Sequence, residues 1–301
     1  MYQTDPPRDP KKFLSTMYDL ESEDTEQVSL PEEINDPRHL YPKKYLPTMH
    51  DLPSENPEEP GLPDEFHDYQ PQLLRETFCP PNYPEDKIFT GSDLNLYYNV
   101  HQSAWYKRPD WFAVVDVDRL YELKELRTSY VTWIEGVNPF VVVELLSPGT
   151  EKEDLGQTVR EANQPPTKWE VYERVLRVPY YFVFSRYTNQ LKAFQLVGSS
   201  YTELELNEQR VWIDEIQLGL GVWQGSYQKI TEQWLRWYDA AGNWILIPEE
   251  AQRQQAEQVA VERQRAEREK QRAERERQRA DRLLAQLRAL GVEPDENFGT
   301  E

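Results

Sequence analysis

Three polar residues, Asp110, Glu144 and Lys168, occupy positions where an ionised side chain is costly. Asp110 follows Pro109 at the entrance to an apolar segment, Glu144 interrupts the apolar run 140–146, and Lys168 opens a segment with helical character, where the helix dipole disfavours a cation. Two carboxylates supply the hard oxygen ligands that Mg²⁺ or Mn²⁺ prefers, and such a cation polarises a phosphodiester and lowers the pKa of a bound water. A nearby ammonium can orient that water or stabilise the extra negative charge on phosphorus. The residue types therefore predict metal-dependent phosphodiester cleavage, with all three residues catalytic and with Asp110 and Glu144 as metal ligands.

Taken one at a time, the same three residues have simpler interpretations. Asp110 could be a turn residue after a proline, Glu144 a solvent-facing residue at a strand end, and Lys168 a surface lysine, because most charged residues are exposed. The chemical interpretation therefore requires elements that bring the three side chains together.

The run 140–146 predicts a central strand, because it is apolar on both alternating faces apart from Glu144. The turn sequence 147–150, Ser-Pro-Gly-Thr, ends this strand. Glu144 is thus expected near the carboxyl end of the strand, which is where ligands of open α/β sheets usually bind.

The next element is a predicted helix, because Thr167 and Glu170 have the spacing of a capping box. It should begin at Lys168 and run to about Arg177, before a Val-Pro pair and a second apolar strand at 180–184. Strand, helix and strand make a βαβ crossover, which brings the start of the helix to the carboxyl end of the first strand. This topology predicts that Lys168 approaches Glu144.

Other segments complete one domain, which we place at 71–248. Further strands are expected at 94–100, 111–117, 130–135, 191–197 and 200–206, ahead of a tryptophan-rich stretch that ends at Trp244. The predicted fold class is α/β (α+β), a mixed β-sheet with a βαβ crossover and flanking helices.

Both flanks of this domain are polar and charged. Residues 1–70 are acidic and proline-rich and predict a disordered arm, in which the segment 11–20 recurs at 43–52 as an internal repeat. The repeat is either part of a solubilising arm or a partner-binding motif present twice. Residues 249–290 predict a long charged helix, which is either a single solvated helix or a weak coiled coil joined near its C-terminal leucines, and 291–301 predict a disordered tail.

Composition limits the location and the partners. The single cysteine, Cys79, cannot form an intramolecular disulfide, the first residues do not resemble a signal peptide, and no apolar run is long enough to span a bilayer, so we expect a cytoplasmic protein without a membrane partner. The net charge is −20, of which −11 lies in residues 1–70 and −7 in 71–248. A domain without a basic surface argues against tight non-specific binding of nucleic acid.

Several motifs together resemble the Uma-type restriction endonucleases, which are abundant in cyanobacteria and belong to the PD-(D/E)XK nuclease superfamily. The resemblance covers about residues 45 to 290. The motifs that carry it are Pro109-Asp110, the segment 142–148 with Asp154 following, the segment 168–172, the segment 178–181, and Leu235 to Asp239 with Gly242. The resemblance implies a restriction-endonuclease-like fold, a divalent cation and a nucleic-acid substrate, for which we expect DNA. The charged C-terminal helix is also typical of the cyanobacterial branch.

One position departs from the superfamily pattern. The lysine expected two residues after the glutamate is replaced by Leu146, and the family is thought to carry it on the following helix instead. Lys168 matches that relocated position, four residues before Tyr172, and is preferred to Lys152 because the capping box independently places it in the first turn of a helix.

Two functions remain open from the sequence. The first is a metal-dependent endonuclease, and the second is a catalytically inactive scaffold that keeps the fold and binds protein partners through its arm and its helix. No glycine-rich phosphate loop follows any predicted strand, so no cofactor other than Mg²⁺ or Mn²⁺ is expected. The two interpretations of the C-terminal helix also differ in the partner they imply: the coiled coil would join copies of the chain into a homo-oligomer, whereas the solvated single helix would not.

Overall fold

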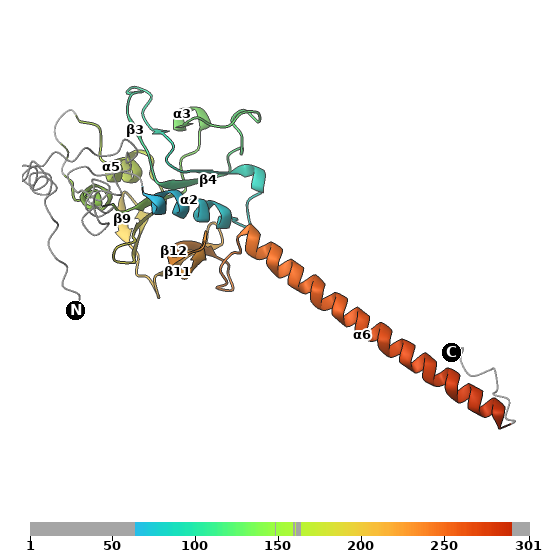
Figure 1. The fold of residues 1–301 in the computed structure, drawn as a ribbon. Coiled ribbons are helices and arrows are strands. Elements are labelled where there is room, and N and C mark those ends of the chain that lie inside the picture. Colours follow the sequence, from blue (N-terminus) through green and yellow to red (C-terminus); the bar gives the residue numbers. More distant parts are fainter. Residues whose placement is uncertain (1–63, 148, 159, 161–163, 291–301) are drawn as a thin grey trace, which may run out of the picture. The chain divides into compact units, whose positions relative to one another are not determined.

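A computed structural model describes residues 64–147, 149–158, 160 and 164–290 (Figure 1). The chain divides into two units, one ending at Ile245 and the other beginning at Leu246, and each is described separately. The strands are β1 (Ile88–Gly91), β2 (Leu96–Tyr97), β3 (Tyr106–Lys107), β4 (Trp111–Val115), β5 (Tyr130–Val131), β6 (Val141–Leu145), β7 (Tyr180–Ser185), β8 (Gln190–Val197), β9 (Ser200–Glu203), β10 (Arg210–Ile213), β11 (Leu218–Tyr227) and β12 (Ile230–Tyr238). The helical elements are α2 (Glu65–Thr77), the 3₁₀ turn η4 (Glu85–Lys87), α3 (Thr132–Glu135), α4 (Glu151–Asp154), α5 (Lys168–Glu170), the π-helical η5 (Val171–Val175) and α6 (Pro248–Ala289).

The main sheet has six strands in the order β1-β4-β6-β7-β8-β9. β6 and β7 are parallel neighbours, with Val143 opposite Phe182, and the other neighbouring pairs are antiparallel. The connection between the two parallel strands includes α4, α5 and η5. The predicted α/β (α+β) class and its βαβ crossover are therefore confirmed, and β6 is a central strand whose five residues are all buried.

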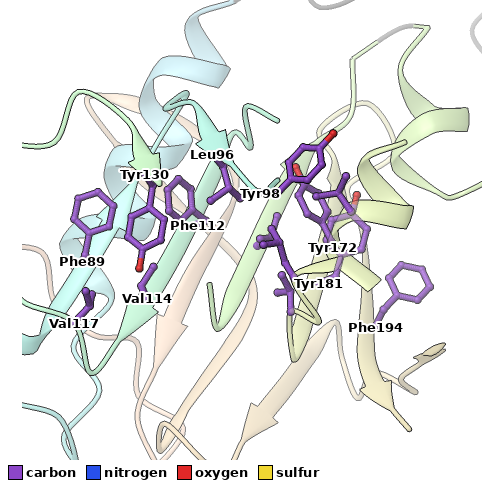
Figure 2. Close-up of a cluster of buried hydrophobic side chains, with 14 of the residues drawn as sticks. Phe89, Leu96, Tyr98, Phe112, Val114, Val117, Tyr130, Tyr172, Tyr181 and Phe194 are labelled. Atoms are coloured by element: carbon purple, nitrogen blue, oxygen red, sulfur yellow. The ribbon is translucent and has the colours of Figure 1, made fainter. Parts of the chain in front are cut away.

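The two faces of the main sheet pack against different layers. On one face, aromatic and aliphatic side chains form a buried cluster with η5, and Figure 2 shows Tyr172, Tyr181 and Phe194 at one end of it. At the other end of the same cluster, Phe89 stacks on Tyr130 with the ring centres 5.5 Å apart (Figure 2). Burying these large side chains is the main favourable contribution to this layer.

The other face is covered by α2 and β12, and β12 belongs to a second sheet with the order β10-β11-β12. Phe66 of α2 stacks on Trp234 of β12 at 5.3 Å and lies 6.1 Å from Phe184 of the main sheet. Gln70 is fully buried, and its amide both donates to the carbonyl of Leu235 and accepts from its N–H. α2 thus joins the two sheets.

The structure differs from the sequence prediction at several elements. The segment predicted as a strand at 130–135 forms only the short β5 and then turns into α3, which ends at Gly136 in a left-handed conformation that glycine adopts without strain. The strand predicted at 94–100 is reduced to β2, and β9 ends at Glu203 rather than at 206.

α2 was not predicted, and it begins ahead of the domain limit that we placed at residue 71. Pro71 lies inside the helix, where it removes one backbone hydrogen bond, and this proline hides the helix from a pattern-based reading. The apolar residues Leu73 and Leu74 are fully buried and hold the helix in place despite the proline. The limits 71–248 themselves stay a prediction.

The second unit contains the 42-residue helix α6, in which no residue is buried. Its surface carries ion pairs at helical spacing, such as Arg265 with Glu269 and Arg272 with Glu276. Among the residues that the structure describes, no helix is both long enough and apolar enough to cross a bilayer. The repeat at 11–20 and 43–52, residues 1–63 of the predicted arm and the predicted tail 291–301 lie outside the described residues.

Candidate active site

Asp110 and Glu144 lie next to each other because β4 runs antiparallel to β6. Trp111 is paired with Val143, so the residue before Trp111 is level with Glu144. The N–H of Asp110 lies 3.4 Å from Oε2 of Glu144, and Oδ2 of Asp110 accepts a hydrogen bond of 2.6 Å from the N–H of Leu145. The two carboxylates are thus held at the carboxyl end of the central strand.

Glu144 projects from β6 toward the η5 layer, on the same side as Val142. It has no exposed surface. Its Oε1 accepts a hydrogen bond of 2.7 Å from the hydroxyl of Tyr172, and its Oε2 accepts one of 3.1 Å from the ammonium of Lys168. A buried carboxylate needs such partners, because an unpaired one would carry the full cost of leaving water.

Lys168 is placed by the predicted capping box, which is present. The hydroxyl of Thr167 accepts from the N–H of Glu170, and the Glu170 carboxylate accepts from the N–H of Thr167. The ammonium of Lys168 lies 2.9 Å from Oδ1 of Asp154 as well as 3.1 Å from Glu144. The lysine therefore bridges two buried carboxylates, one from β6 and one from α4.

These contacts shift the ionisation of the site. Burial raises the pKa of Glu144 to about 7 and that of Asp154 to about 6, while the Lys168 ammonium opposes both shifts. Burial also raises the pKa of Asp110, against the opposing charges of Lys168 and His67. The pKa of Lys168 lies well above its ordinary value, because the three carboxylates outweigh the lowering effect of burial. Lys168 is consequently a permanent cation, whereas Glu144 and Asp154 titrate close to neutral pH.

The helix predicted from Lys168 to about Arg177 changes its winding after one turn. η5 is π-helical, with the N–H of Leu176 bonded to the carbonyl of Val171, five residues earlier. Its buried Tyr172 packs on Tyr181 of β7 with the ring centres 5.4 Å apart, and Figure 2 shows the two residues together. Single π-helical turns often occur at functional sites, and this one carries the hydroxyl that binds Glu144.

An imidazole from α2 reaches the same strand end. Nε2 of His67 lies 3.1 Å from the carbonyl oxygen of Leu145 and 3.1 Å from Oγ of Ser147. Nδ1 of His67 lies 2.7 Å from Asp64, the N-cap of α2, and Asp64 forms an ion pair with Arg186.

A cleft of about 700 Å³ opens at this end of the sheet. Asp110, Asp154, Lys168 and His67 all line it. Both signs of charge contribute further lining residues, namely Asp64, Asp68, Glu76, Asp93, Arg75 and Arg108. Lys152, the alternative to Lys168, is exposed on α4 and is not part of the lining.

The structure brings the three residues singled out from the sequence, Asp110, Glu144 and Lys168, into one constellation. Asp154, which entered the sequence reasoning only through the family resemblance, pairs with Lys168. His67 was missed, because a histidine in a charged segment before a proline carries no signal until the helix α2 is known. Its distance in sequence from Leu145, 78 residues, hides the contact from any local pattern.

The carboxylates are the residues that could hold a cation. Asp110 and Glu144 offer hard oxygen atoms, and Mg²⁺ is commonly bound through one or two carboxylates, with water and substrate phosphate completing its shell. Within the described ranges, no group of three or more His, Cys, Asp or Glu side chains is arranged to hold a metal ion by itself. Asp110 and Glu144 are the pair of neighbouring carboxylates whose chemistry fits such a cation.

Comparisons with known proteins identify a family. Residues 45–225 match the family model described as "Uma2: Putative restriction endonuclease". No curated protein matches the chain. Among solved structures, the chain is similar to "a putative nuclease belonging to DUF820 from Anabaena variabilis ATCC 29413", with 9% sequence identity, a TM-score of 0.37, and coverage of 52% of this chain and 76% of that one. At that TM-score the likeness carries no argument about this chain.

Proposed function

This chain belongs to the Uma2 family, whose model is described as "Putative restriction endonuclease", and we propose that the chain is a metal-dependent nuclease that hydrolyses phosphodiester bonds of DNA. Family membership supports nuclease function in general. The metal dependence, the DNA substrate and the roles of individual residues are our proposal.

The observation that carries the proposal is the position of Lys168. Its ammonium is held within 3.1 Å of Glu144 and 2.9 Å of Asp154, on the wall of a cleft that Asp110 also lines. A fixed positive charge stabilises negative charge that develops on a phosphoryl group without any reorganisation during the reaction. An exposed lysine would be screened by water and would have to be ordered first.

Asp110 and Glu144 are the proposed ligands of a divalent cation, Mg²⁺ or Mn²⁺. When bound, such a cation supplies charge for the phosphodiester and lowers the pKa of the attacking water. Asp110 lines the cleft directly, whereas Glu144 is fully buried behind it, with the cleft-lining Lys168 at its Oε2. Asp154 keeps Lys168 charged and oriented, and Tyr172 fixes the second oxygen of Glu144.

The test is cleavage of DNA by the purified full-length chain with Mg²⁺ or Mn²⁺, suppressed by a chelator. The variants Asp110→Asn, Glu144→Gln and Lys168→Met approximate the shape of each side chain. Because Lys168→Met leaves the buried Glu144 and Asp154 without the ammonium, a thermal melt of each variant comes first and shows that it folds. Each should reduce turnover by on the order of a hundredfold or more. The two carboxylate variants should also lose metal affinity in calorimetry, whereas Lys168→Met should keep it, because it removes no oxygen ligand.

Lys152→Met is the matched control, because Lys152 lies nearby on α4 but is exposed and outside the cleft lining. It should leave turnover unchanged. If Lys168→Met retained activity and Lys152→Met lost it, the lysine would be misassigned.

A second candidate function, a scaffold without catalysis, is favoured by the charge of the cleft. Acidic residues outnumber lysine and arginine in its lining, and residues 71–248 carry a net charge of −7. An acidic surface repels nucleic acid unless a cation intervenes. If no nucleic acid were cut and calorimetry detected no binding of Mg²⁺ or Mn²⁺, the scaffold would replace the nuclease.

A further inference from the structure

The contacts of both ring nitrogens of His67 favour its protonated form. Nδ1 lies 2.7 Å from a carboxylate oxygen of Asp64, and Nε2 lies 3.1 Å from the carbonyl oxygen of Leu145. A carboxylate and a backbone carbonyl accept hydrogen bonds, so the doubly protonated imidazolium, with one N–H toward each, satisfies both contacts at once. A neutral ring protonated on Nδ1 would keep the bond to Asp64 and accept from the Ser147 hydroxyl, but it would leave the Leu145 carbonyl without this donor.

The surroundings of His67 favour that charged form. Asp64 faces it from the N-terminus of α2, and Asp110 from the entrance to β4, and these two carboxylates raise the pKa of His67 although burial alone would lower it. Arg186, which follows β7, pairs with the other oxygen of Asp64 at 3.0 Å and fixes its orientation. Ser147, at the end of β6, adds a neutral hydroxyl.

The imidazolium is also positioned to meet a ligand. Its side chain retains 12% of its surface exposed, and His67, Ser147 and Asp110 line the same cleft. The Nε2–H is shared between Leu145 and Ser147, both neutral acceptors. An anionic phosphate oxygen forms a hydrogen bond about twice as strong as a neutral acceptor does, so it can replace the Ser147 hydroxyl as acceptor. The Ser147 O–H can then donate to the same anion.

We propose that His67 is a further catalytic residue, an imidazolium that binds the phosphodiester anion of the substrate in this cleft. The inference rests on the proposed nuclease function and adds a second cation to Lys168. The charge of Lys168 is shared with two carboxylates, so in an acidic cleft a second donor of positive charge assists the approach of a phosphate.

Two substitutions distinguish a role of the positive charge of His67 in binding phosphate from a purely structural role of its hydrogen bonds. His67→Gln keeps a side-chain amide that can donate to the Leu145 carbonyl, but it removes the charge. Asp64→Asn keeps a good N-cap for α2, but it removes the carboxylate that holds the imidazolium. His101→Gln is the matched control, because His101 is an exposed histidine outside the cleft lining.

The measurements use the full-length protein without metal. Nitrogen NMR of the His67 ring should give two protonated nitrogens at neutral pH, and dimethyl phosphate, a phosphodiester without base or sugar, should shift these signals. A short DNA duplex should bind His67→Gln about tenfold or more weakly than the wild type, as expected for one lost charge-assisted hydrogen bond. Asp64→Asn should weaken binding in the same direction, while His101→Gln should bind as the wild type does. In cleavage assays, His67→Gln should raise KM more than it lowers kcat.

Several results would overturn the proposal. A neutral ring with one tautomer, DNA binding by His67→Gln equal to that of the wild type, or loss of a ring proton on addition of Mg²⁺ or Mn²⁺ would each do so, the last by making His67 a metal ligand. Failure of the nuclease proposal looks different. In that case no DNA would be cut, while the ring would remain doubly protonated and would still respond to dimethyl phosphate.

Discussion

The two oxygens of Glu144 have different partners, and both come from one short helical segment. Lys168 supplies a charge to Oε2, and Tyr172 supplies a hydroxyl to Oε1 at 2.7 Å. Both contacts lower the pKa of Glu144 against the larger effect of burial, which raises it to about 7. The charge state of this carboxylate at neutral pH therefore depends on Lys168 and Tyr172 as well as on burial.

Tyr172→Phe isolates the hydroxyl contact. The variant leaves Oε1 of Glu144 buried without its donor, so it should lower the free energy of unfolding by about 1–3 kcal/mol and move the pKa of Glu144 further upward. The rise of cleavage rate with pH should shift to higher pH.

Tyr181→Phe is the matched control for this change. Tyr181 is equally buried and donates at 2.8 Å to the main-chain carbonyl of Asp154, so its loss should cost similar stability without moving the pH profile. Thermal melts and pH–rate profiles of both variants give the comparison. A pH profile shifted equally by both would mean that Tyr172 acts only through packing.

The raised pKa of Glu144 also predicts how the stability of the metal-free protein depends on pH. The ordinary value is 4.5 and the folded value is about 7, so between these values the folded state holds a proton that the unfolded state releases. The free energy of unfolding contributed by this group therefore falls as pH rises from about 4.5 to about 7, and Asp154, raised to about 6, acts in the same direction.

Glu144→Gln cannot titrate and serves as the reference. In the presence of chelator, the melting temperature of the variant minus that of the wild type should increase across this pH range and then level off. A constant difference would contradict the raised pKa.

At the residue scale, the sequence predicted Asp110, Glu144 and Lys168 as site residues. An ionised side chain is energetically costly at each of these positions, within or beside an apolar strand or in the first turn of a helix. Their proximity is present in the structure, and their catalytic roles stay a proposal. Asp154 and His67 lacked such a signal. Asp154 lies in α4, a helix of only four residues, and His67 lies in α2, whose helical pattern is interrupted by Pro71. Neither position has a local pattern that predicts it, and both side chains are placed by tertiary packing.

At the scale of elements, α2 contributes more to the candidate site and to the packing of the two sheets than its sequence suggests. It carries His67 to the cleft, and it joins the two sheets through Phe66 and Gln70. The predicted arm 1–70 included the first turns of this helix. The arm was interpreted from composition, and α2 is polar on average, so its buried residues were not separated from the acidic stretch before it.

Truncation tests the contribution of α2. We predict that a chain beginning at Asp64 keeps a cooperative thermal melt, because the acidic, proline-rich composition of residues 1–63 argues against burial. A chain beginning at Pro71 should melt at a much lower temperature or without cooperativity, since it loses the Phe66 stacking and leaves Leu235 without its buried partner Gln70. Equal melts of the two chains would show that the first turns of α2 are dispensable. A lost melt for the chain beginning at Asp64 would show that the preceding residues pack on the domain.

The elements that were predicted well share a strong local signal. β6 and β7 are continuous apolar runs, and α5 begins at a capping box, so each is determined by neighbouring residues. The π-helical winding of η5 is different. It depends on packing Tyr172 beneath the main sheet, and no local pattern distinguishes it from an α-helix.

At the scale of the whole chain, α6 is long, charged and without a buried residue, so it needs another source of stability than packing within its own unit. A helix that is polar all round is stabilised by side-chain pairs at helical spacing, and α6 has such pairs between arginine and glutamate. Near its C-terminal end the composition changes. Leu283, Leu284 and Leu287 expose 51%, 38% and 39% of their surface in the single chain.

This leucine cluster predicts that any self-association through α6 depends on these three residues. Leucines at heptad-related positions are buried when two helices pair, and the resulting burial is the favourable contribution to a coiled coil. Changing all three to Gln should preserve the helix in circular dichroism, since Gln is a good helix former, while the mass measured by light scattering falls to that of the monomer. Val261→Gln is the matched control, because Val261 is 66% exposed on the same helix and lies outside the cluster. An unchanged mass in the triple variant would contradict the prediction and place the contact between subunits elsewhere. A wild-type chain that is already monomeric would show that α6 does not join subunits.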